Sequence, residues 1–472
     1  MMKQWYESSV FYHLYPLGCT GAPDFNHGEA ASRFDQLNAW IPYISGMGFN
    51  ALYIGPLFES SSHGYDTRDY RKVDCRLGTN EEFRDFVAAC HSAGIRVVID
   101  AVFNHTGREF FAFRDIQEKK WDSPYKDWYR GVSFHCSSPM GDPFCYDAWQ
   151  GQFQLPCLNL KNPEVKQYIF DTVRFWVDTF DIDGLRLDCA GDLDFDFMKE
   201  LRKATAPMKE AFWLMGEVIH GEYGRWVNDE MLHSVTNYAL HKAFYSAHND
   251  HNYFEIAHTI KRLPFKGIQL YTFTDNHDED RLASKLADKA HFEPLYTLLF
   301  TLPGIPSIYY GSEWGMEGKR TSHSDKALRP AVTAEEAESR ENGLKDLIRK
   351  LIRIHRENPE FHGGLYQELY LTNRQFAFAR YGSESIIITA VNCDSSPSAF
   401  VLPLPICSRK AENLMTGEEF PVEHDVLPVR LEANSAAVIK LWDALMEDGK
   451  PLDEGDMDPE ELKELLGDQW EE

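Results

Sequence analysis

The chain has 472 residues, of which 43% are hydrophobic, so it can bury a large core and form more than one domain. Its formal net charge of −26 repels the phosphates of nucleic acids and anionic membrane surfaces, which argues against both as partners. No stretch approaches the ~20 consecutive apolar residues that cross a bilayer. We therefore expect a soluble protein with a neutral substrate.

Two further features of the sequence concern the cellular compartment. The start MMKQWYESSVFYHLYP lacks the basic and then apolar layout of a secretory signal, which predicts a cytoplasmic protein. The nine cysteines are odd in number and show neither a CxxC pair nor a Cys/His metal spacing. We expect all of them to be reduced thiols.

Short β-type runs alternate with helical patterns over the first three quarters of the chain. The β-type runs lie near residues 10, 50, 95, 182, 212, 268 and 305. Helical patterns fall between them, for example at 81–94 and at 163–180, where Asn162 and Pro163 form a helix start signal. Such alternation predicts βαβ units and a parallel sheet. We therefore predict an α/β fold with a (β/α)8 TIM barrel, which needs ~250 residues.

Two departures from this alternation predict additional domains. The segment 105–156 is rich in aromatic residues, contains Pro and Gly, and is too long for a passive loop. Short β-type runs from about residue 360 predict a C-terminal antiparallel β-sandwich. The segment from Met446 carries twelve acidic and two basic residues and one short helix after Asp458. The predicted domains are the barrel (1–104 and 157–360), an insertion domain B after the third strand (105–156), the sandwich (361–445) and an acidic tail (446–472).

Charged side chains end four of the apolar runs, where the strands of a barrel carry an active site. The four clusters are Asp100 with Asn104 and His105, Arg186 with Asp188, Glu217, and His277 with Asp278. One acidic residue at a strand end is more often a cap or a surface charge. Four clusters in succession are hard to explain in that way, so we expect them to meet at the mouth of the barrel.

The spacing of these residues suggests a reaction. Arg186 and Asp188 are two residues apart in a strand, so both side chains project to one face. The arginine would hold Asp188 ionised, as a nucleophile requires. Glu217 follows the apolar run FWLM, whose desolvation would favour a protonated acid. One ionised and one protonated carboxyl group form the arrangement that cleaves glycosides.

The motifs DAVFNH, GLRLD, GE and FTDNHD resemble the four signature regions of the α-amylase superfamily, glycoside hydrolase family 13, in the family's order. The resemblance covers roughly residues 8–360, with further matches in HGYDTRDY, LPCLN and SDKALR. It implies a retaining α-glycoside hydrolase that acts on α-1,4-linked glucans or maltodextrins through a covalent glycosyl-enzyme intermediate.

The resemblance also implies a role for each matching residue. Asp188 would be the nucleophile, Glu217 the general acid/base and Asp278 the third carboxylate, which stabilises the transition state. The residues implied to bind the sugar at the cleavage point are Tyr65, His105, Arg186, His277, Asp325 and Arg329. Plainer interpretations are a hydrogen-bonded core histidine for His105 and a surface ion pair for Asp325 and Arg329.

Departures from the family pattern concern a metal. Many members read LPDLN where this chain reads LPCLN, and that aspartate is a calcium ligand in the typical amylase. Cys157 cannot replace a hard oxygen ligand. The lysine and histidine that often follow the nucleophile are here Gly191 and Asp192. We therefore expect no calcium at that position and no other cofactor.

The substrate is the least specified property. GDPFCYDAWQGQFQLPCLN and GEVIH are similar to the cyclomaltodextrinase and neopullulanase group. Because the first β-type run lies near residue 10, we expect this protein to lack the extra N-terminal domain usual in that group. Aromatic residues in the insertion favour a short cleft for α-glucan oligosaccharides: Trp121, Tyr125, Trp128, Tyr129, Phe134, Phe144, Tyr146 and Trp149. Cyclomaltodextrinase, α-amylase, α-glucosidase and 4-α-glucanotransferase activities stay open. A non-catalytic glucan-binding relative is the alternative of another class, and the oligomeric state is not predicted.

Overall fold

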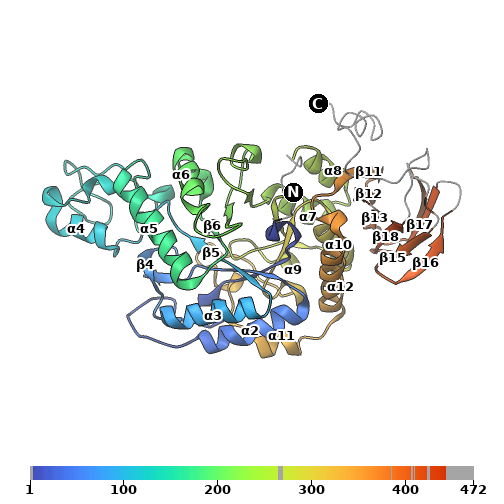
Figure 1. Ribbon diagram of the computed structural model, residues 1–472, viewed down its shortest axis with the longest axis horizontal. Coiled ribbons are helices and arrows are strands. Elements are labelled where there is room, and N and C mark those ends of the chain that lie inside the picture. The colour runs from blue at the N-terminus through green and yellow to red at the C-terminus, as the bar shows by residue number, and fades with distance from the viewer. Residues whose placement is uncertain are drawn as a thin grey trace.

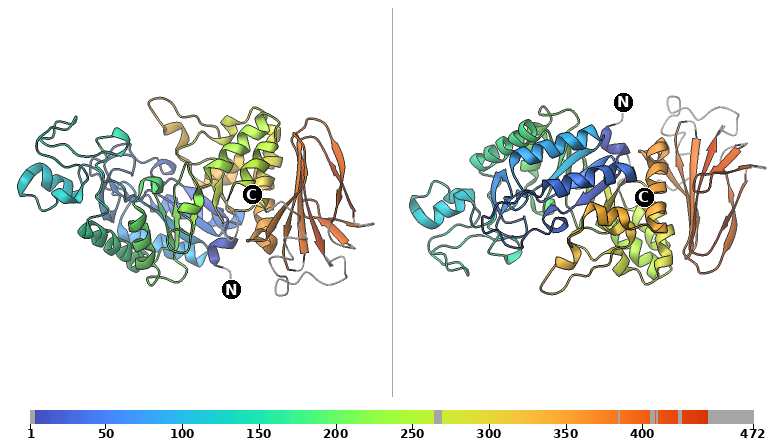
Figure 2. Two further views of the ribbon diagram at one scale, coloured as in Figure 1. Left: turned by 90° about the horizontal axis from the view of Figure 1, so that it is seen from above. Right: turned by 90° about the horizontal axis from the view of Figure 1, so that it is seen from below.

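The computed structural model describes residues 4–263, 269–383, 385–404, 408, 410–422 and 426–442. A barrel forms the middle of the molecule, with the insertion at one end and the C-terminal strands at the other (Figures 1 and 2). None of the helices in these ranges is long and apolar enough to cross a membrane. The predicted acidic tail and its short helix lie outside the described residues.

Eight parallel strands form the barrel. They are β1 (Phe11–Leu14), β2 (Ala51–Ile54), β5 (Arg96–Ala101), β6 (Gly184–Leu187), β7 (Trp213–Gly216), β8 (Ser234–Val235), β9 (Tyr271–Phe273) and β10 (Ile305–Tyr309). Their order in the sheet is β8-β7-β6-β5-β2-β1-β10-β9. Large side chains such as Phe11, Tyr53 and Trp213 pack together in one buried cluster, so the barrel is filled rather than open. The predicted barrel is confirmed.

β8, the sixth barrel strand along the chain, closes the barrel, and no pattern in the sequence predicts it. β8 has only two residues, too few to show any periodicity. The amide of Tyr271 on β9 donates to Oγ of Ser234 at 2.9 Å, and the amide of Asn237 donates to the carbonyl of Tyr271 at 2.8 Å. These bonds connect the two ends of the sheet.

Helices cover the outside of the strands (Figure 2). The longer ones are α2 (Phe34–Met47), α3 (Asn80–Ser92), α5 (Pro163–Phe180), α6 (Phe195–Thr205), α7 (Tyr238–Asn249), α8 (Phe254–Lys261), α10 (Phe292–Thr301) and α12 (Gly343–Glu357). Shorter ones are α1 (Pro16–Cys19), α9 (Leu282–Lys285) and α11 (Ala334–Ser339). The predicted start of α5 is confirmed, because the side chain of Asn162 accepts from the amides of Glu164 and Val165.

Short 3-10 turns connect these elements. They are η1 (Trp5–Ser8), η2 (Lys120–Asp122), η3 (Lys126–Trp128), η4 (Trp149–Gly151), η5 (Ala190–Asp192), η6 (Tyr223–Arg225), η7 (Lys289–His291), η8 (Ser312–Trp314), η9 (Lys326–Leu328) and η10 (Pro359–Phe361). A hairpin of β3 (Phe58–Ser60) and β4 (Thr67–Val73) extends from the barrel after β2. Its connecting loop carries Tyr65.

The insertion follows β5, the third strand of the barrel, and contains α4 (Phe111–Lys119) and the turns η2, η3 and η4. Half of the eight aromatic residues predicted to face the cleft are buried: Trp128, Tyr129, Phe144 and Tyr146. Phe113 of α4 contacts three of these rings. Half of these aromatic side chains therefore pack into the hydrophobic cluster that the insertion shares with the barrel, while Trp121 is 56% exposed.

The C-terminal strands form two antiparallel sheets, as predicted. One has the order β11-β12-β13-β18-β15-β16 and the other pairs β14 with β17. The bounds are β11 (Leu365–Leu371), β12 (Gln375–Tyr381), β13 (Ser385–Asn392), β14 (Ser398–Pro403), β15 (Lys410–Asn413), β16 (Glu418–Pro421), β17 (Val426–Leu431) and β18 (Ala436–Trp442). Side chains of both sheets, including Ile388, Leu402 and Leu427, share one buried cluster.

The prediction that every cysteine is a reduced thiol is wrong for one pair. Cys136 and Cys145 form a disulfide within the insertion. The antiparallel bridge between Ser133 and Cys145 brings the two cysteines together, and their sequence spacing alone did not indicate this. The free thiols among the described residues are Cys19, Cys75, Cys90, Cys157, Cys189 and Cys393, whereas Cys407 lies outside them.

Candidate active site

Arg186 on β6 connects three carboxylates that come from three neighbouring strands. Its Nη1 atom lies 2.9 Å from Oδ1 of Asp100 and 2.8 Å from Oδ1 of Asp188, and its Nη2 atom lies 2.8 Å from Oε1 of Glu217. Asp100 stands opposite Arg186 in the register of β5 and β6, and Glu217 directly follows β7. The structure therefore brings together the predicted Arg186, Asp188 and Glu217 at the C-terminal ends of the strands.

The two carboxyl groups of Asp188 and Glu217 are close neighbours. One oxygen of each lies within 4.8 Å of the other, and both residues are buried. The amide of Cys189 donates to Oε2 of Glu217 at 3.0 Å, which fixes the second oxygen of that group. Two carboxyl groups that approach this closely can act on opposite sides of one glycosidic bond.

The protonation of Asp188 differs from what the sequence suggested. Burial raises the pKa of Asp188 to about 8, and the charges of Glu217 and Asp100 act in the same direction, against Arg186. The expectation that Arg186 holds this carboxyl ionised is thus opposed by burial and by the two neighbouring carboxylates. One guanidinium is shared among three carboxylates, so it cannot compensate for all of them. Asp188 is therefore protonated near neutral pH in the site without substrate.

Asp278 lies in a different electrostatic environment. Its Oδ2 atom is 2.9 Å from Nε2 of His277, and its Oδ1 atom is 2.7 Å from Nη2 of Arg329. Burial would raise the pKa of Asp278, but His277 and Arg329 outweigh it and hold that pKa well below its usual range. Asp278 is therefore ionised at all pH values at which the protein would work.

Tyr65 and His277 form one wall beside this carboxylate. Their rings are stacked with centroids 5.7 Å apart, and the hydroxyl of Tyr65 lies 2.5 Å from Nε2 of His277. The same hydroxyl donates to Oδ2 of Asp100 at 2.8 Å. The structure thus joins Tyr65, from the β3–β4 hairpin, to both the Arg186 cluster and the Asp278 cluster.

Arg329 and Asp325 flank η9 but differ in their position. Arg329 donates from Nε to the carbonyl of His277 at 2.9 Å in addition to its pair with Asp278, and its side chain is 13% exposed. Asp325 is 33% exposed and pairs with Arg320 at 2.8 Å, while its oxygen lies 3.5 Å from Arg329. Arg329 thus belongs to the buried cluster, and Asp325 lies at its rim.

His105 lies at the opposite edge of the site, against the insertion. Its ring is 5.7 Å from that of Trp149, and burial lowers the pKa of His105 to about 3, so it is neutral. Its Nε2 atom is buried without a hydrogen-bond partner among the described residues. A buried donor or acceptor of this kind is costly unless a ligand satisfies it. This observation favours a sugar-binding histidine over a core histidine.

Sequence reasoning missed three residues of the site. The hydroxyl of Tyr53 donates to Asp100 at 2.9 Å, and that of Tyr238 lies 3.5 Å from Oε1 of Glu217. The thiol of Cys189 lies 3.2 Å from Oδ2 of Asp188. Tyr53 lies in the apolar strand β2 and Tyr238 lies in the helix α7, and no sequence motif marks either residue as functional. Cys189 directly follows Asp188, so its position next to the nucleophile could have been noticed.

The residues at the position of the family's calcium site do not fit that ion. Cys157 is buried, and burial raises the pKa of its thiol, so the side chain is neutral. A neutral thiol cannot replace the charged oxygen ligand that calcium requires at this position. The side-chain amide of Asn104 lies 3.2 Å from Nδ1 of His105.

Comparisons with known proteins identify the family of the chain. The family model for the α-amylase catalytic domain matches residues 35–352, more than half of the chain. Neopullulanase 2 of Thermoactinomyces vulgaris is 32% identical over 93% of this chain and 78% of its own length. The cyclomaltodextrinase of Thermoanaerobacter pseudethanolicus is 29% identical over the same shares of the two chains.

Solved structures of other proteins superpose on this chain over most of its length. The debranching enzyme of Nostoc punctiforme superposes with a TM-score of 0.78 and 27% identity, covering 94% of this chain and 100% of its own. A cyclomaltodextrinase superposes with a TM-score of 0.82 over 93% of this chain and 78% of its own, at 24% identity, which bears on the fold alone. The family match, together with the carboxylates at the ends of β6 and β7, establishes that the chain belongs to the α-amylase family, glycoside hydrolase family 13.

Proposed function

We propose that this glycosidase hydrolyses short maltodextrins, linear and cyclic, with retention of the α configuration. Membership of the α-amylase family supports an α-glucan hydrolase. The choice of short substrates rests on similarity to proteins named cyclomaltodextrinase, neopullulanase 2 and intracellular maltogenic amylase. The same similarity to the Bacillus subtilis intracellular enzyme supports a cytoplasmic location.

The observation that carries the proposal is the approach of Asp188 and Glu217 to within 4.8 Å. Retaining glycosidases place their two carboxyl groups ~5–5.5 Å apart, whereas inverting ones need ~6.5–9.5 Å to admit a water. Asp188 attacks the anomeric carbon while Glu217 protonates the glycosidic oxygen, and the leaving sugar departs. Glu217 then takes a proton from water, which attacks the glycosyl-enzyme and releases an α product.

The remaining residues have supporting roles in this proposal. Asp278, kept ionised by His277 and Arg329, accepts hydrogen bonds from sugar hydroxyls and stabilises positive charge at the transition state. Tyr65 provides a ring face beside the reacting sugar. Arg186 keeps Asp188 and Glu217 at a fixed separation.

Two alternatives use the same carboxylates. A 4-α-glucanotransferase or an α-glucosidase would differ in whether water or a sugar attacks the intermediate, or in the number of sugar subsites. A non-catalytic glucan-binding relative is disfavoured, because Asp188, Glu217 and Asp278 are all present at the ends of the strands.

The anomer released first tests the proposal. Proton NMR during the first minutes of maltoheptaose cleavage should detect the α-anomer before mutarotation, whereas the β-anomer would exclude the double displacement. The product profile on maltoheptaose, with and without added glucose, separates hydrolysis from transfer. Longer products that increase with glucose would indicate a glucanotransferase.

A further inference from the structure

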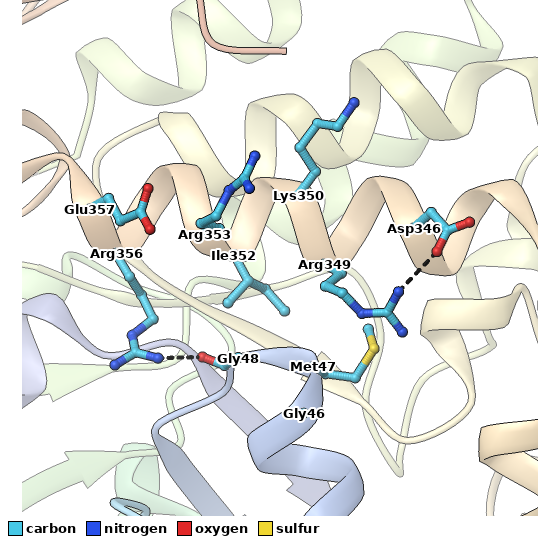
Figure 3. Close-up of a pocket in the computed structure, with 10 residues that line it drawn as sticks. All are labelled: Gly46, Met47, Gly48, Asp346, Arg349, Lys350, Ile352, Arg353, Arg356 and Glu357. Carbon is cyan, nitrogen blue, oxygen red and sulfur yellow. Dashed lines mark hydrogen bonds and ion pairs between the residues drawn. The ribbon is translucent and has the colours of Figure 1, made fainter. Parts of the chain in front are cut away.

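A cationic pocket of about 590 Å³ lies between the C-terminal end of α2 and the helix α12 (Figure 3). Gly46, Met47 and Gly48 form its α2 side. The charged residues of α12 that line it are Arg349, Lys350, Arg353 and Arg356, with Asp346 and Glu357. Four cations and two anions give this lining an excess of positive charge in a chain whose net charge is −26.

The pocket lies away from the catalytic groups. Gly48 caps the end of α2 and is followed by β2, so it lies at the N-terminal ends of the barrel strands. Asp188 and Glu217 lie at the C-terminal ends. Substrate binding therefore does not explain the arginines of this helix.

The three arginines of the pocket keep donors available for an anionic ligand, whereas Lys350 donates to the carbonyl of Met415 at 2.8 Å. Arg353 is exposed and has no hydrogen-bond or ion-pair partner among the described residues. Arg349 pairs with the exposed Asp346 at 2.9 Å, a surface pair of small energy, and Arg356 uses Nη1 to bind the carbonyl of Gly48 at 2.8 Å. Each guanidinium has five N–H donors, so free donors remain on all three. In Figure 3, Arg349 and Arg356 extend toward α2.

The described chain ends close to one end of this helix. Nζ of Lys440 on β18 donates to Oδ1 of Asn358 at 2.9 Å and pairs with Glu360 at 3.1 Å. Asn358 is the residue that caps the C-terminus of α12. Trp442, two residues after Lys440, is the last residue described. The thirty residues 443–472 therefore start beside the helix that carries the pocket.

The charge and length of 443–472 match the pocket. This segment contains thirteen acidic and two basic residues. Thirty residues can extend up to ~100 Å, whereas a helix of fifteen residues is only ~22 Å long. Tethering gives such a segment an effective concentration in the millimolar range without any further contact.

We propose that the acidic segment 443–472 binds in the same molecule to the cationic pocket on α12, through charge-assisted hydrogen bonds from Arg349, Arg353 and Arg356 to its carboxylates. This interaction does not depend on the proposed enzymatic function. It is electrostatic and exposed to solvent, so salt weakens it.

The test uses the full-length chain and a double variant, Arg349→Glu with Arg353→Glu. A matched control, Arg84→Glu with Arg114→Glu, reverses the charge of two exposed arginines on α3 and α4, away from the pocket. Arg84 pairs with Asp85, and Arg114 pairs with Glu109. Equal thermal midpoints of the three proteins establish that each is folded. The first readout is the rate at which a glutamate-specific protease removes the segment at low salt.

We expect the segment to be cut several-fold faster in the pocket variant than in the wild type and the control, and about 1 M salt to abolish the difference. The second readout is carbodiimide coupling, which should join carboxyl groups of 443–472 to the amine of Lys350 within one chain, at a yield independent of protein concentration. Equal cleavage rates in all three proteins would overturn the proposal. Coupling only between different copies of the chain would overturn the intramolecular arrangement.

Discussion

Arg186 and Asp188, two residues apart on β6, are joined by an ion pair of 2.8 Å between Nη1 and Oδ1. The second terminal nitrogen of the same guanidinium lies 2.8 Å from Glu217. This single cation sets the geometry of both candidate catalytic carboxyl groups, but Asp100 competes for it. One guanidinium therefore faces three carboxyl groups and does not balance the charge of all of them.

The substitution Asp188→Asn should separate activity from stability. We expect kcat to fall by at least ~10³-fold, because the amide cannot form the glycosyl ester. The pKa of Asp188 is about 8 in the folded protein, above its unfolded value. In the unfolded chain, Asp188 ionises at a lower pH than it does in the folded protein. The free energy of unfolding therefore falls as the pH rises toward 8, and this loss is complete above that pH.

Asparagine removes this penalty, so calorimetry should give the variant a thermal midpoint that gains on the wild type between about pH 5 and pH 9. A midpoint that instead falls behind the wild type as the pH rises would mean that Asp188 is stabilised as an anion. The activity comparison requires protein free of contaminating wild type.

The thiol of Cys189 should tune the pH dependence. It lies 3.2 Å from Oδ2 of Asp188, and this hydrogen bond lowers the pKa of Asp188. In the wild type, kcat/KM should rise with pH on the acidic side up to about pH 8, where Asp188 loses its proton and can act as the nucleophile. Cys189→Ala removes the donor, so its acidic limb should move to higher pH, while Cys189→Ser keeps a donor and should resemble the wild type. Identical acidic limbs in all three proteins would refute a positioning role for the thiol.

Calcium removal should have little effect. Because the neutral, buried thiol of Cys157 replaces a carboxylate ligand, dialysis against EDTA should leave activity and the thermal midpoint unchanged. A midpoint that drops by many degrees and recovers with added calcium would show that a metal contributes to stability, at this position or another.

We expect this protein to prefer short glucans to long ones as substrates. Trp149 is the aromatic of the insertion that lies beside His105, and its Nε1 atom donates to Asp192 at 3.1 Å, so it borders the site. We expect a higher kcat/KM for maltotriose to maltoheptaose and for β-cyclodextrin than for soluble starch, and Trp149→Ala should reduce it for maltoheptaose. Initial rates on this series decide the question. A preference for starch with internal cleavage from the start would mean a cleft open to polymers.

The sequence predicted those features that depend on local pattern. Apolar runs located the barrel strands that have three or more residues, and the charged residues that end them located Asp188, Glu217 and Asp278. β8 escaped detection because two residues show no period. The disulfide between Cys136 and Cys145 and the raised pKa of Asp188 depend on how separate segments meet in space, which spacing along the chain does not specify.

Covalent trapping tests the central claim, that Asp188 is the nucleophile of a double displacement, most directly. A 5-fluoro-α-glucosyl fluoride slows breakdown of the intermediate, so the intact protein should gain the mass of one fluoroglucosyl group. Peptide mapping should place that group on Asp188, and Asp188→Asn should not be labelled. Label on another carboxylate, or turnover without any covalent adduct together with a β-anomeric product, would contradict the account.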